Sequence, residues 1–502
     1  MLLICGACST SSKYTPSGNP LLDLRNPELL TRDRVSAAKT AWGEVEQGIR
    51  DRERTRFALK NLAWSGATER DLRLAVLQLL MSDYTDEGSA DSRSMARLIL
   101  PNEKDPEAIR IIALRAIDSG WDDMVPALVR SFARQNPDVP DHGRIEYAAL
   151  RELRPDETIP QVVFEVFLYP TRGIESEQEL SVLRIAQRTR DEAWGLLSRL
   201  DPTGESRRHF LDVEIDSLEG LSEDSQKLIE DLQAARRELD VLPDSSMEIG
   251  WLQTLRDHPD LRNRDLNQEW WAETSQVVQS LGVEQRNGIE MRHLEPVRWA
   301  SQNRPAWLKL GRESLYAVLN ERLSGRVHHK RKNEKGEPPR KERLGDWFES
   351  MPWGDLLTIL IIDEAMKNPV VLEQLFIQRE LDQKDETTEY GGVVETDSDT
   401  GWRAVLFRPR QRDRVSDQRF VASDDMFRFS DRSLAHYHFH ADRRSNSQYA
   451  GPSITDQLNA SNSGRNCMVF TSIDSEAINI DVYFPNGVVV DLGEFVEPTG
   501  GG

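Results

Sequence analysis

The amino-terminal part of the chain carries a repeated helical pattern, and this repeat restricts the possible folds more than any other feature. Between residues 31 and 200, apolar residues recur at intervals of three and four, which is typical of amphipathic helices. Four segments align on a leucine, at spacings of 37, 36 and 33 residues: Leu77, Leu114, Leu150 and Leu183. A single helix pair cannot bury its apolar face, whereas stacked pairs can. The pattern therefore predicts an all-α solenoid over residues 31–200, with the Leu and Ala stripes in its core.

The repeat most resembles HEAT-type helical repeats. The unit of such repeats is a pair of helices, and two of the aligned segments are followed by a turn and a second helix that begins near Pro126 or Pro160. Solenoids commonly serve as protein-binding surfaces. The resemblance therefore implies that the repeats bind a protein partner or a protein substrate, by analogy of fold.

The remainder of the chain predicts further domains. At 502 residues the chain is long enough for more than one domain. Residues 201–345 predict a helical, Trp-rich linker region that contains a basic loop at residues 326–343. This loop includes Pro and Gly and is expected to be exposed and mobile. Residues 353–496 predict a separate domain, and residues 497–502 a disordered tail.

The first 30 residues predict a lipid-anchored tether. The start MLLICGACSTSS has apolar residues, then small residues before Cys8, and resembles a bacterial lipoprotein signal. Residues 9–30 are rich in Ser, Pro, Gly and Asn, as in a flexible linker. A basic leader and a full-length apolar segment are missing. Two interpretations stay open: a membrane-attached, extracytoplasmic protein lipidated at Cys8, or a cytoplasmic protein with an uncleaved amino terminus.

From Glu389 onward the pattern changes from helical to strand-like. Val, Phe, Tyr and Thr alternate with polar residues, as in a half-buried sheet. The candidate strands are residues 402–410, 419–429, 434–441, 467–473, 478–484 and 488–495. Together with a helical segment over residues 353–384, these strands predict an α+β domain with a mixed sheet.

Three alternating histidines mark a candidate metal site in this domain. Residues in a strand alternate between faces, so His436, His438 and His440 would project from one face. Two imidazoles at positions i and i+2 can bind one metal ion, and the downstream Asp456 can supply a third ligand. The alternation allows either His436 with His438 or His438 with His440. Ser453 is well placed to cap a short helix that would carry Asp456 to the metal.

This arrangement resembles the signature of the JAMM zinc metallopeptidases, which is a Glu, then His-x-His, then Ser-x-x-Asp. The matching residues here are Glu389, His438, His440, Ser453 and Asp456, in that order. The resemblance implies that the two histidines and Asp456 bind Zn²⁺ and leave a fourth position for water. It also implies that Glu389 acts as general base and that Ser453 donates a hydrogen bond to the oxyanion.

Two features depart from the family pattern. The residue after the second histidine is Ala441 instead of the usual Pro, and the segment that follows, up to Ser453, is longer than usual. The inserted loop either selects substrates or marks loss of the site. His438 and His440 are the preferred ligand pair because they lie closer to the Ser-x-x-Asp, which leaves His436 as a supporting or core residue.

The sequence thus predicts one of two functions from different classes. The first is a JAMM-like zinc peptidase that cleaves a peptide or isopeptide bond, with helical repeats that bind its partner or substrate. The second is a non-catalytic, membrane-anchored interaction scaffold in which the JAMM-like domain is structural. A net charge of −21 argues against binding nucleic acid, which requires a basic face. No apolar run reaches the roughly 20 residues needed to span a bilayer.

Overall fold

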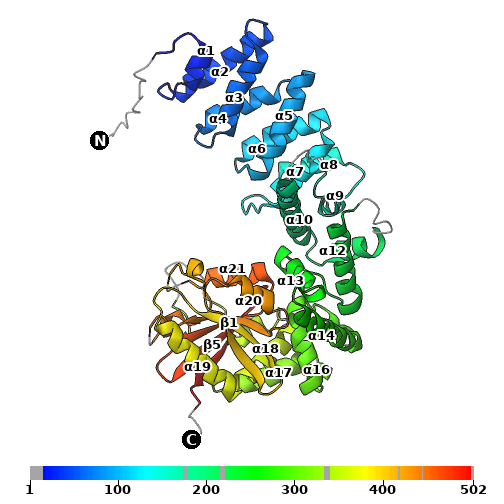
Figure 1. Ribbon diagram of the computed structural model, residues 1–502, viewed down its shortest axis with the longest axis vertical. Coiled ribbons are helices and arrows are strands. Elements are labelled where there is room, and N and C mark those ends of the chain that lie inside the picture. The colour runs from blue at the N-terminus through cyan, green and yellow to red at the C-terminus, as the bar shows by residue number, and fades with distance from the viewer. Residues whose placement is uncertain are drawn as a thin grey trace, which may run out of the picture. The chain divides into compact units, whose positions relative to one another are not determined.

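The computed structural model describes residues 15–172, 179–214, 221–332, 340–416, 419–443 and 445–498. The chain divides into two compact units, residues 1–202 and 203–502. The first unit is helical over its described residues, and the second contains a mixed six-stranded sheet near its carboxyl end (Figure 1). This confirms the coarse prediction of a helical amino-terminal region followed by an α+β domain. Cys8 lies outside the described residues.

The first unit is built from consecutive helices. These are α1 Pro20–Arg25, α2 Thr31–Glu46, α3 Arg52–Trp64, α4 Arg70–Met81, α5 Asp86–Ile99, α6 Pro106–Ser119, α7 Val125–Ala133, α8 Ile145–Leu153, α9 Ile159–Leu168 and α10 Glu179–Leu200. Helices α2, α4, α6 and α8 contact one another in series, and α10 packs against α7 and α9. Each helix of that series therefore packs against the helix two positions further along the chain.

Helix α1 occupies part of the segment that was expected to be a flexible tether. The side chain of Asn19 caps its first turn, and Pro20 occupies the first helical position, where the missing N–H is tolerated. Leu21 and Leu24 are buried, and α1 packs against α2. The tether predicted for residues 1–30 is therefore replaced by packed structure from Pro20 onward.

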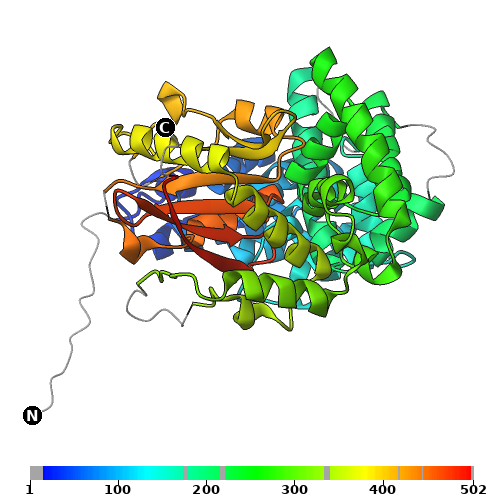
Figure 2. The ribbon, with the colours of Figure 1, turned by 90° about the horizontal axis from the view of Figure 1, so that it is seen from below.

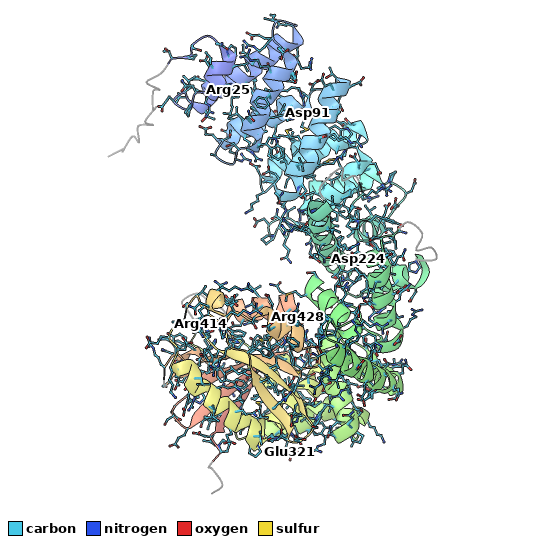
Figure 3. The ribbon with its side chains drawn as sticks, viewed as in Figure 1. Arg25, Asp91, Asp224, Glu321, Arg414 and Arg428 are labelled. Atoms are coloured by element: carbon cyan, nitrogen blue, oxygen red, sulfur yellow. The ribbon has the colours of Figure 1, made fainter. Side chains whose placement is uncertain are left out.

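Ion pairs join helices of the first unit at a regular interval. Arg34 of α2 contacts Glu69, the residue that precedes α4, at 2.7 Å, and Arg70 of α4 contacts Asp105, which precedes α6, at 2.6 Å. The two members of each pair are 35 residues apart. Asp91 of α5, labelled in Figure 3, contacts Arg56 of α3 at 2.7 Å with the same separation. The three ion pairs thus follow an interval close to that of the leucine repeat.

Only half of the predicted leucine stripe lies in the core. Leu77 and Leu150 are fully buried, whereas Leu114 is 38% exposed and Leu183 is 52% exposed. In α6 the buried face is formed instead by Ala108, Ile109, Ile112, Ala113 and Ala116. Each step along an α-helix rotates the side chain by about 100°. Leu114 therefore points to the side of the buried face of α6, although its segment aligns in sequence with the segments of Leu77, Leu150 and Leu183.

Leu77 and Leu114 provide a matched test of this assignment. We expect Leu77→Ala to lower the free energy of unfolding by about 2–5 kcal/mol, because it leaves a cavity in a packed interior. Leu114→Ala should lower it by less than about 1 kcal/mol, because the side chain is already partly hydrated. Urea unfolding of the two full-length variants, followed by circular dichroism, would check this. Equal losses of stability would contradict the burial pattern.

The second unit begins with helices and ends with the sheet. Its helices before the sheet are α11 Glu205–His209, α12 Glu223–Ala234, α13 Ser246–Arg256, α14 Leu261–Ser280, α15 Val283–Arg286, α16 Leu294–Asn303, α17 Arg312–Leu323, α18 Trp353–Met366 and α19 Pro369–Gln383. The elements that follow are β1 Gly391–Asp397, β2 Gly401–Leu406, α20 Asp424–Phe429, β3 Ala435–His440, α21 Ile454–Ser463, β4 Cys467–Ser472, β5 Ala477–Tyr483 and β6 Val489–Val496.

The sheet has the strand order β2-β1-β3-β4-β5-β6. Strands β3 and β4 are parallel, and the chain between them contains α21, whereas the other neighbours are antiparallel. The strand predicted over residues 419–429 is wrong. Ser423 accepts a hydrogen bond from the backbone N–H of Met426, and this N-cap starts the short helix α20. Ser423, Asp424 and Asp425 form a helix-start signal, and this signal outweighs the apolar alternation that had suggested a strand.

Helices lie on both sides of the sheet, with α21 on one side and α19 on the other (Figure 1); Figure 2 shows the same ribbon from below. Tyr437 of β3 donates a hydrogen bond to Gln378 of α19, and its neighbour His438 points to Asp456 of α21. Because neighbouring residues of a strand point to opposite faces, α19 and α21 lie on opposite sides. The polar side chains of the candidate metal site therefore share the face that α21 covers.

Both edges of the sheet are covered by other parts of the unit. Gln374 and Gln378 of α19 bond to the backbone of Ala404 in β2. At the other edge, backbone bonds of 2.8 Å join Val327 to Glu494 and Glu342 to Asp491. The flanks of the predicted mobile loop 326–343 are thus paired with β6, and residues 333–339 lie outside the described residues. Covered edges protect a sheet from pairing with other chains.

A buried ionic cluster attaches the helical region to the sheet. Asp355 of α18 is fully buried and contacts Arg292, and it accepts hydrogen bonds from His293 Nε2 and Asn486 Nδ2, each at 2.8 Å. Burial raises the pKa of Asp355, but Arg292 and the hydrogen bonds outweigh it and lower the pKa to about 2. The region predicted as a linker is therefore packed into the same unit as the sheet.

Candidate metal centre

Local structure sets the three candidate ligands. His438 and His440 alternate with buried aromatic residues in β3, so both imidazoles reach the same face of the sheet. Asp456 is held by a capping box at the start of α21. Ser453 Oγ accepts the Asp456 N–H at 3.2 Å, and Ser453 N–H donates to Asp456 Oδ2 at 2.7 Å. The box fixes the carboxylate in the first turn of the helix.

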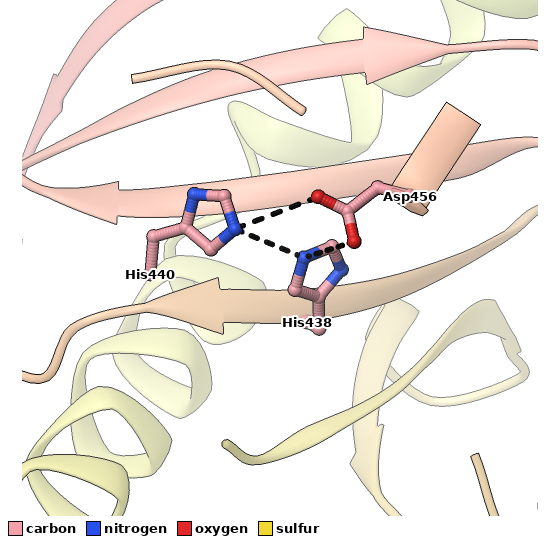
Figure 4. Close-up of side chains that lie close together, drawn as sticks. All are labelled: His438, His440 and Asp456. Carbon is pink, nitrogen blue, oxygen red and sulfur yellow. Dashed lines mark hydrogen bonds and ion pairs between the residues drawn. The ribbon is translucent and has the colours of Figure 1, made fainter. Parts of the chain in front are cut away.

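The two imidazoles and the carboxylate converge on one point (Figure 4). The Nε2 atoms of His438 and His440 are 3.3 Å apart, and they lie 3.6 and 3.7 Å from the two oxygens of Asp456. The potential ligand atoms all lie within 4.8 Å of one another. Among the described residues, this is the group of His, Cys, Asp and Glu side chains with the spacing to hold a metal ion.

Hydrogen bonds behind the group orient both rings. His440 Nδ1 lies 3.1 Å from the carbonyl oxygen of Tyr449. A carbonyl can only accept, so Nδ1 carries the proton and Nε2 presents its lone pair to the centre. His438 Nδ1 lies 3.4 Å from the hydroxyl of Tyr483, whose pKa is raised well above its ordinary value by burial. Partners of this kind hold metal-binding histidines in the correct tautomer.

Charges within the group favour a bound cation. Burial raises the pKa of Asp456, but His438 and His440 outweigh it and hold that pKa well below its usual range. Burial lowers the pKa of His438, yet Asp456 and Glu389 more than offset this and raise it overall. The buried carboxylate thus favours positive charge at this centre, which a divalent cation supplies more strongly than a proton.

Glu389 reaches the same site from the neighbouring strand. In the antiparallel register of β1 and β3, Gly391 pairs with His438, so continuing the ladder places Glu389 opposite His440 and on the same face. Burial raises the pKa of Glu389, and the two histidines offset this only in part. The backbone N–H of Phe420 donates a hydrogen bond to its carboxylate. The geometry therefore provides a carboxylate beside the histidines that takes up a proton more readily than an ordinary glutamate.

The missing side chain of Gly391 makes room for a ring beside the ligand His438. A Cβ atom at this position would lie 2.5 Å from the ring of Phe420 and 2.4 Å from the carbonyl oxygen of Tyr437. The Phe420 ring lies nearly parallel to the imidazole of His438, at 6° with centroids 5.7 Å apart. Phe420 thus supports the His438 ring on one side and Glu389 through its backbone.

His436 lies apart from the ligand group. Its Nε2 is 3.0 Å from Ser430 Oγ, and its ring packs against Phe427 with centroids 5.6 Å apart. Burial, and next the charge of Arg465, lower the pKa of His436 well below its ordinary value, so this imidazole is neutral. The structure brings together the pair His438 and His440 and leaves His436 buried outside that group, in the wall of the same cavity.

Described residues of the segment between His440 and Ser453 contribute to the site. Ala441, which follows the second candidate ligand, is fully buried. Asn446 is also fully buried, and its Nδ2 donates to the backbone carbonyl of His440 at 3.1 Å. Its own N–H donates to the carbonyl of Ser472 at 2.7 Å. Asn446 thereby fixes the loop that places the Tyr449 carbonyl behind His440.

We expect Asn446→Ala to weaken metal binding by about 10- to 100-fold, because the carbonyl that orients His440 loses its support. Asn459→Ala is the matched control, since Asn459 is an exposed residue of α21 that lines the same cavity. Titration of each purified variant with zinc in competition with a chelator would measure the affinities. Equal zinc affinities of Asn446→Ala and Asn459→Ala would show that Asn446 has no role in metal binding.

The candidate ligands line a cavity of about 850 Å³. Its wall includes the residues predicted for the site: Glu389, His436, His438, His440, Ser453 and Asp456. It also includes Met247 of α13 and Arg331 of the basic loop, from a region that was predicted as a linker. Helical spacing in the sequence could not reveal this, because packing of α13 against α21 brings Met247 to the site.

Comparisons of the chain with protein-family models, with curated proteins and with solved structures found no match. Across the described residues, every helix is too short or too polar to cross a membrane.

Proposed function

We propose that the second unit is a zinc-dependent hydrolase, similar to the JAMM metallopeptidases, that cleaves a peptide or isopeptide bond. One observation carries this proposal. His438, His440 and Asp456 converge with Glu389 in one cavity, and they follow the order of that family's signature along the chain. The site is built from adjacent strands and a capped helix, which suits a catalytic centre because rigid elements hold the groups in place.

The donor set fits zinc. Two imidazole nitrogens and one carboxylate, with a fourth position open, are typical of catalytic zinc sites. Ligand atoms on a tetrahedral zinc ion with bonds of about 2.0–2.1 Å are separated by about 3.3 Å. The separation of 3.3 Å between His438 Nε2 and His440 Nε2 matches this, and the two distances to Asp456 are only slightly longer. A small inward movement of the carboxylate would complete the ligand set.

The chain's own residues then take defined roles. Zinc, when bound, lowers the pKa of a water molecule and polarises the substrate carbonyl. Glu389 accepts the proton of the attacking water and delivers it to the leaving amine, for which its raised pKa is suited. The Ser453 hydroxyl accepts the Asp456 N–H, so its own proton remains available for the developing oxyanion.

The direct test is hydrolysis of a defined probe. Zinc-loaded protein is incubated with a mixed-sequence library of N-acetylated peptides, and new amino termini are identified by mass spectrometry. We expect cleavage that stops when a chelator removes the metal and returns when zinc is restored. Bound zinc without cleavage would favour the scaffold function, in which the domain binds partners without catalysis.

For the first unit we propose a HEAT-like solenoid that binds a protein partner or the substrate. Two observations support it: helices pack against the helix two positions along, and ion pairs join residues 35 apart at equivalent places. Both are expected of stacked helix pairs. The test compares partner capture by the full-length chain with capture by full-length variants substituted at exposed residues of α2 to α8. We expect these substitutions to reduce capture, and unchanged capture would contradict the proposal.

We also propose that the chain is anchored to a membrane on the extracytoplasmic side through a lipidated Cys8. The small residues before Cys8 and the Ser-rich segment after it support this. We expect palmitate labelling in a bacterial host to be lost almost completely in Cys8→Ser, because the thiol is the acceptor. Cys467→Ser is the control, since Cys467 is buried in the second unit. Label that persists in Cys8→Ser would favour the cytoplasmic alternative.

A further inference from the structure

A second chamber adjoins the candidate active site. It has a volume of about 360 Å³, and Met247, Phe427 and Ser463 line both it and the larger cavity. Volumes of this size are typical of ligand pockets. Because the same side chains form the boundary, the two spaces are neighbouring parts of one cleft that begins at the metal ligands.

Helix α13 forms one wall of the second chamber. Its contributing residues are Met247, Gly250, Trp251 and Thr254, which follow the i, i+3, i+4, i+7 spacing of one helix face. Across from them the chamber is lined by Phe427 and Arg428 of α20, and Arg428 is labelled in Figure 3. The wall therefore comes from a helix that precedes the sheet in the chain and packs against α21.

The α13 wall presents apolar surface, because its polar groups are already bonded. Trp251 Nε1 donates to the carbonyl of Asp431 at 2.9 Å, and Thr254 Oγ1 donates to the carbonyl of Gly250 at 2.8 Å. Met247 keeps 41% of its surface exposed, and a methionine side chain adapts readily to apolar ligands. Such a wall gains free energy by covering apolar groups, and the side-chain donors of Trp251 and Thr254 are already used within the protein.

Two cations at the chamber disfavour basic ligands. Arg428 is exposed at its edge. Arg465 is buried, stacks on Trp251 with 3.5 Å from its guanidinium carbon to the ring centroid, and donates to the carbonyl of Ser430 at 3.0 Å. A lysine or arginine side chain entering the chamber would meet like charge, which is an effective way to reject a ligand.

We propose that this chamber is a substrate subsite, formed by α13, that accepts an apolar side chain near the scissile bond and excludes basic ones. The inference rests on the proposed function. It names the substrate class: a polypeptide with Leu, Met or Phe at one fixed position relative to the bond that is cut. It also gives the helical region before the sheet a part in substrate selection.

Gly250 allows a precise substitution. A Cβ atom at Gly250 would meet no heavy atom within 4 Å, and Gly250 lines the chamber, so Gly250→Leu adds apolar bulk at the chamber wall without a clash at its Cβ. Gly195→Leu is the matched control, because Gly195 is also a helical glycine facing open space, in α10 of the first unit. Neither residue contacts the metal group, so zinc content should stay the same in both variants.

The first arm of the test measures cleavage of the N-acetylated library. We expect the zinc-loaded protein to favour Leu, Met or Phe over Ala at one position by about 10-fold or more, which is the range for apolar pockets. Gly250→Leu should remove this preference, and Gly195→Leu should retain it. Cleavage without an apolar preference, or a preference that survives Gly250→Leu, would overturn the subsite and leave the proposed hydrolysis standing.

The second arm measures binding in the absence of turnover. Zinc-loaded Glu389→Gln protein, with and without Gly250→Leu, is incubated with the same library, and retained peptides are sequenced. One outcome is that Glu389→Gln protein retains apolar peptides, that Gly250→Leu abolishes this retention, and that the wild type cleaves no peptide. This outcome would support the subsite and overturn hydrolysis. Neither cleavage nor retention would overturn both.

Discussion

Replacing His438 and His440 together by alanine is expected to reduce bound zinc from about one ion per chain to about zero. The two Nε2 atoms are 3.3 Å apart and are oriented by partners behind each ring, so they would supply two of the three candidate protein ligands. A single carboxylate cannot retain the ion in competition with water. Metal analysis of the purified full-length proteins, after loading with zinc and removal of the excess, would measure the result.

A second pair of histidines gives the control for this experiment. His328 and His329 are adjacent in the basic loop and contact Asp491 and Glu494 at 3.0 Å each. Their replacement by alanine should leave zinc content unchanged, because they lie outside the ligand group. A wild type that binds no zinc even when the ion is supplied would disprove the metal centre. If the His438→Ala/His440→Ala variant still binds zinc, the metal site lies elsewhere in the chain.

Glu389→Gln is expected to keep the zinc ion and to lower peptide hydrolysis by about 10²- to 10⁴-fold, the range for loss of a general acid–base group. The amide has the shape of the carboxylate but cannot accept the proton of the attacking water. The effect should fall on turnover more than on substrate binding, because Glu389 lies beside the ligands and is not one of them. Rates of library cleavage at several peptide concentrations would separate the two.

Glu342→Gln is the matched control for this substitution. Glu342 is also a buried glutamate of the second unit whose pKa burial raises, but it pairs with the edge of β6 instead of lining the cavity. Its variant should hydrolyse peptides at the wild-type rate. Full activity in Glu389→Gln would remove this residue from the mechanism. Loss of zinc in Glu389→Gln would instead show a role in the metal site itself.

The parts of the site that sequence reasoning predicted depend on short-range geometry. Strand alternation places His438 and His440 on one face, and the Ser-x-x-Asp spacing forms the capping box that holds Asp456. Both follow from backbone conformation within a few residues. Alternation could not decide between His436 and His440 as the partner of His438. Ser430 and Phe427 decide this, because they hold the His436 ring outside the ligand group.

The amino acid sequence by itself thus determined the helical first unit, the mixed sheet after it and the order of the polar residues at the site. Periodicity and capping are local, so they can be recognised without knowing the fold. Only the tertiary structure decided that Leu114 is exposed, that the Tyr449 carbonyl orients His440 and that α13 reaches the cleft. Each of these three features depends on which helices and strands pack against one another. The free energy of that packing comes from contacts between residues far apart in the sequence, which the local pattern of apolar and polar residues does not specify.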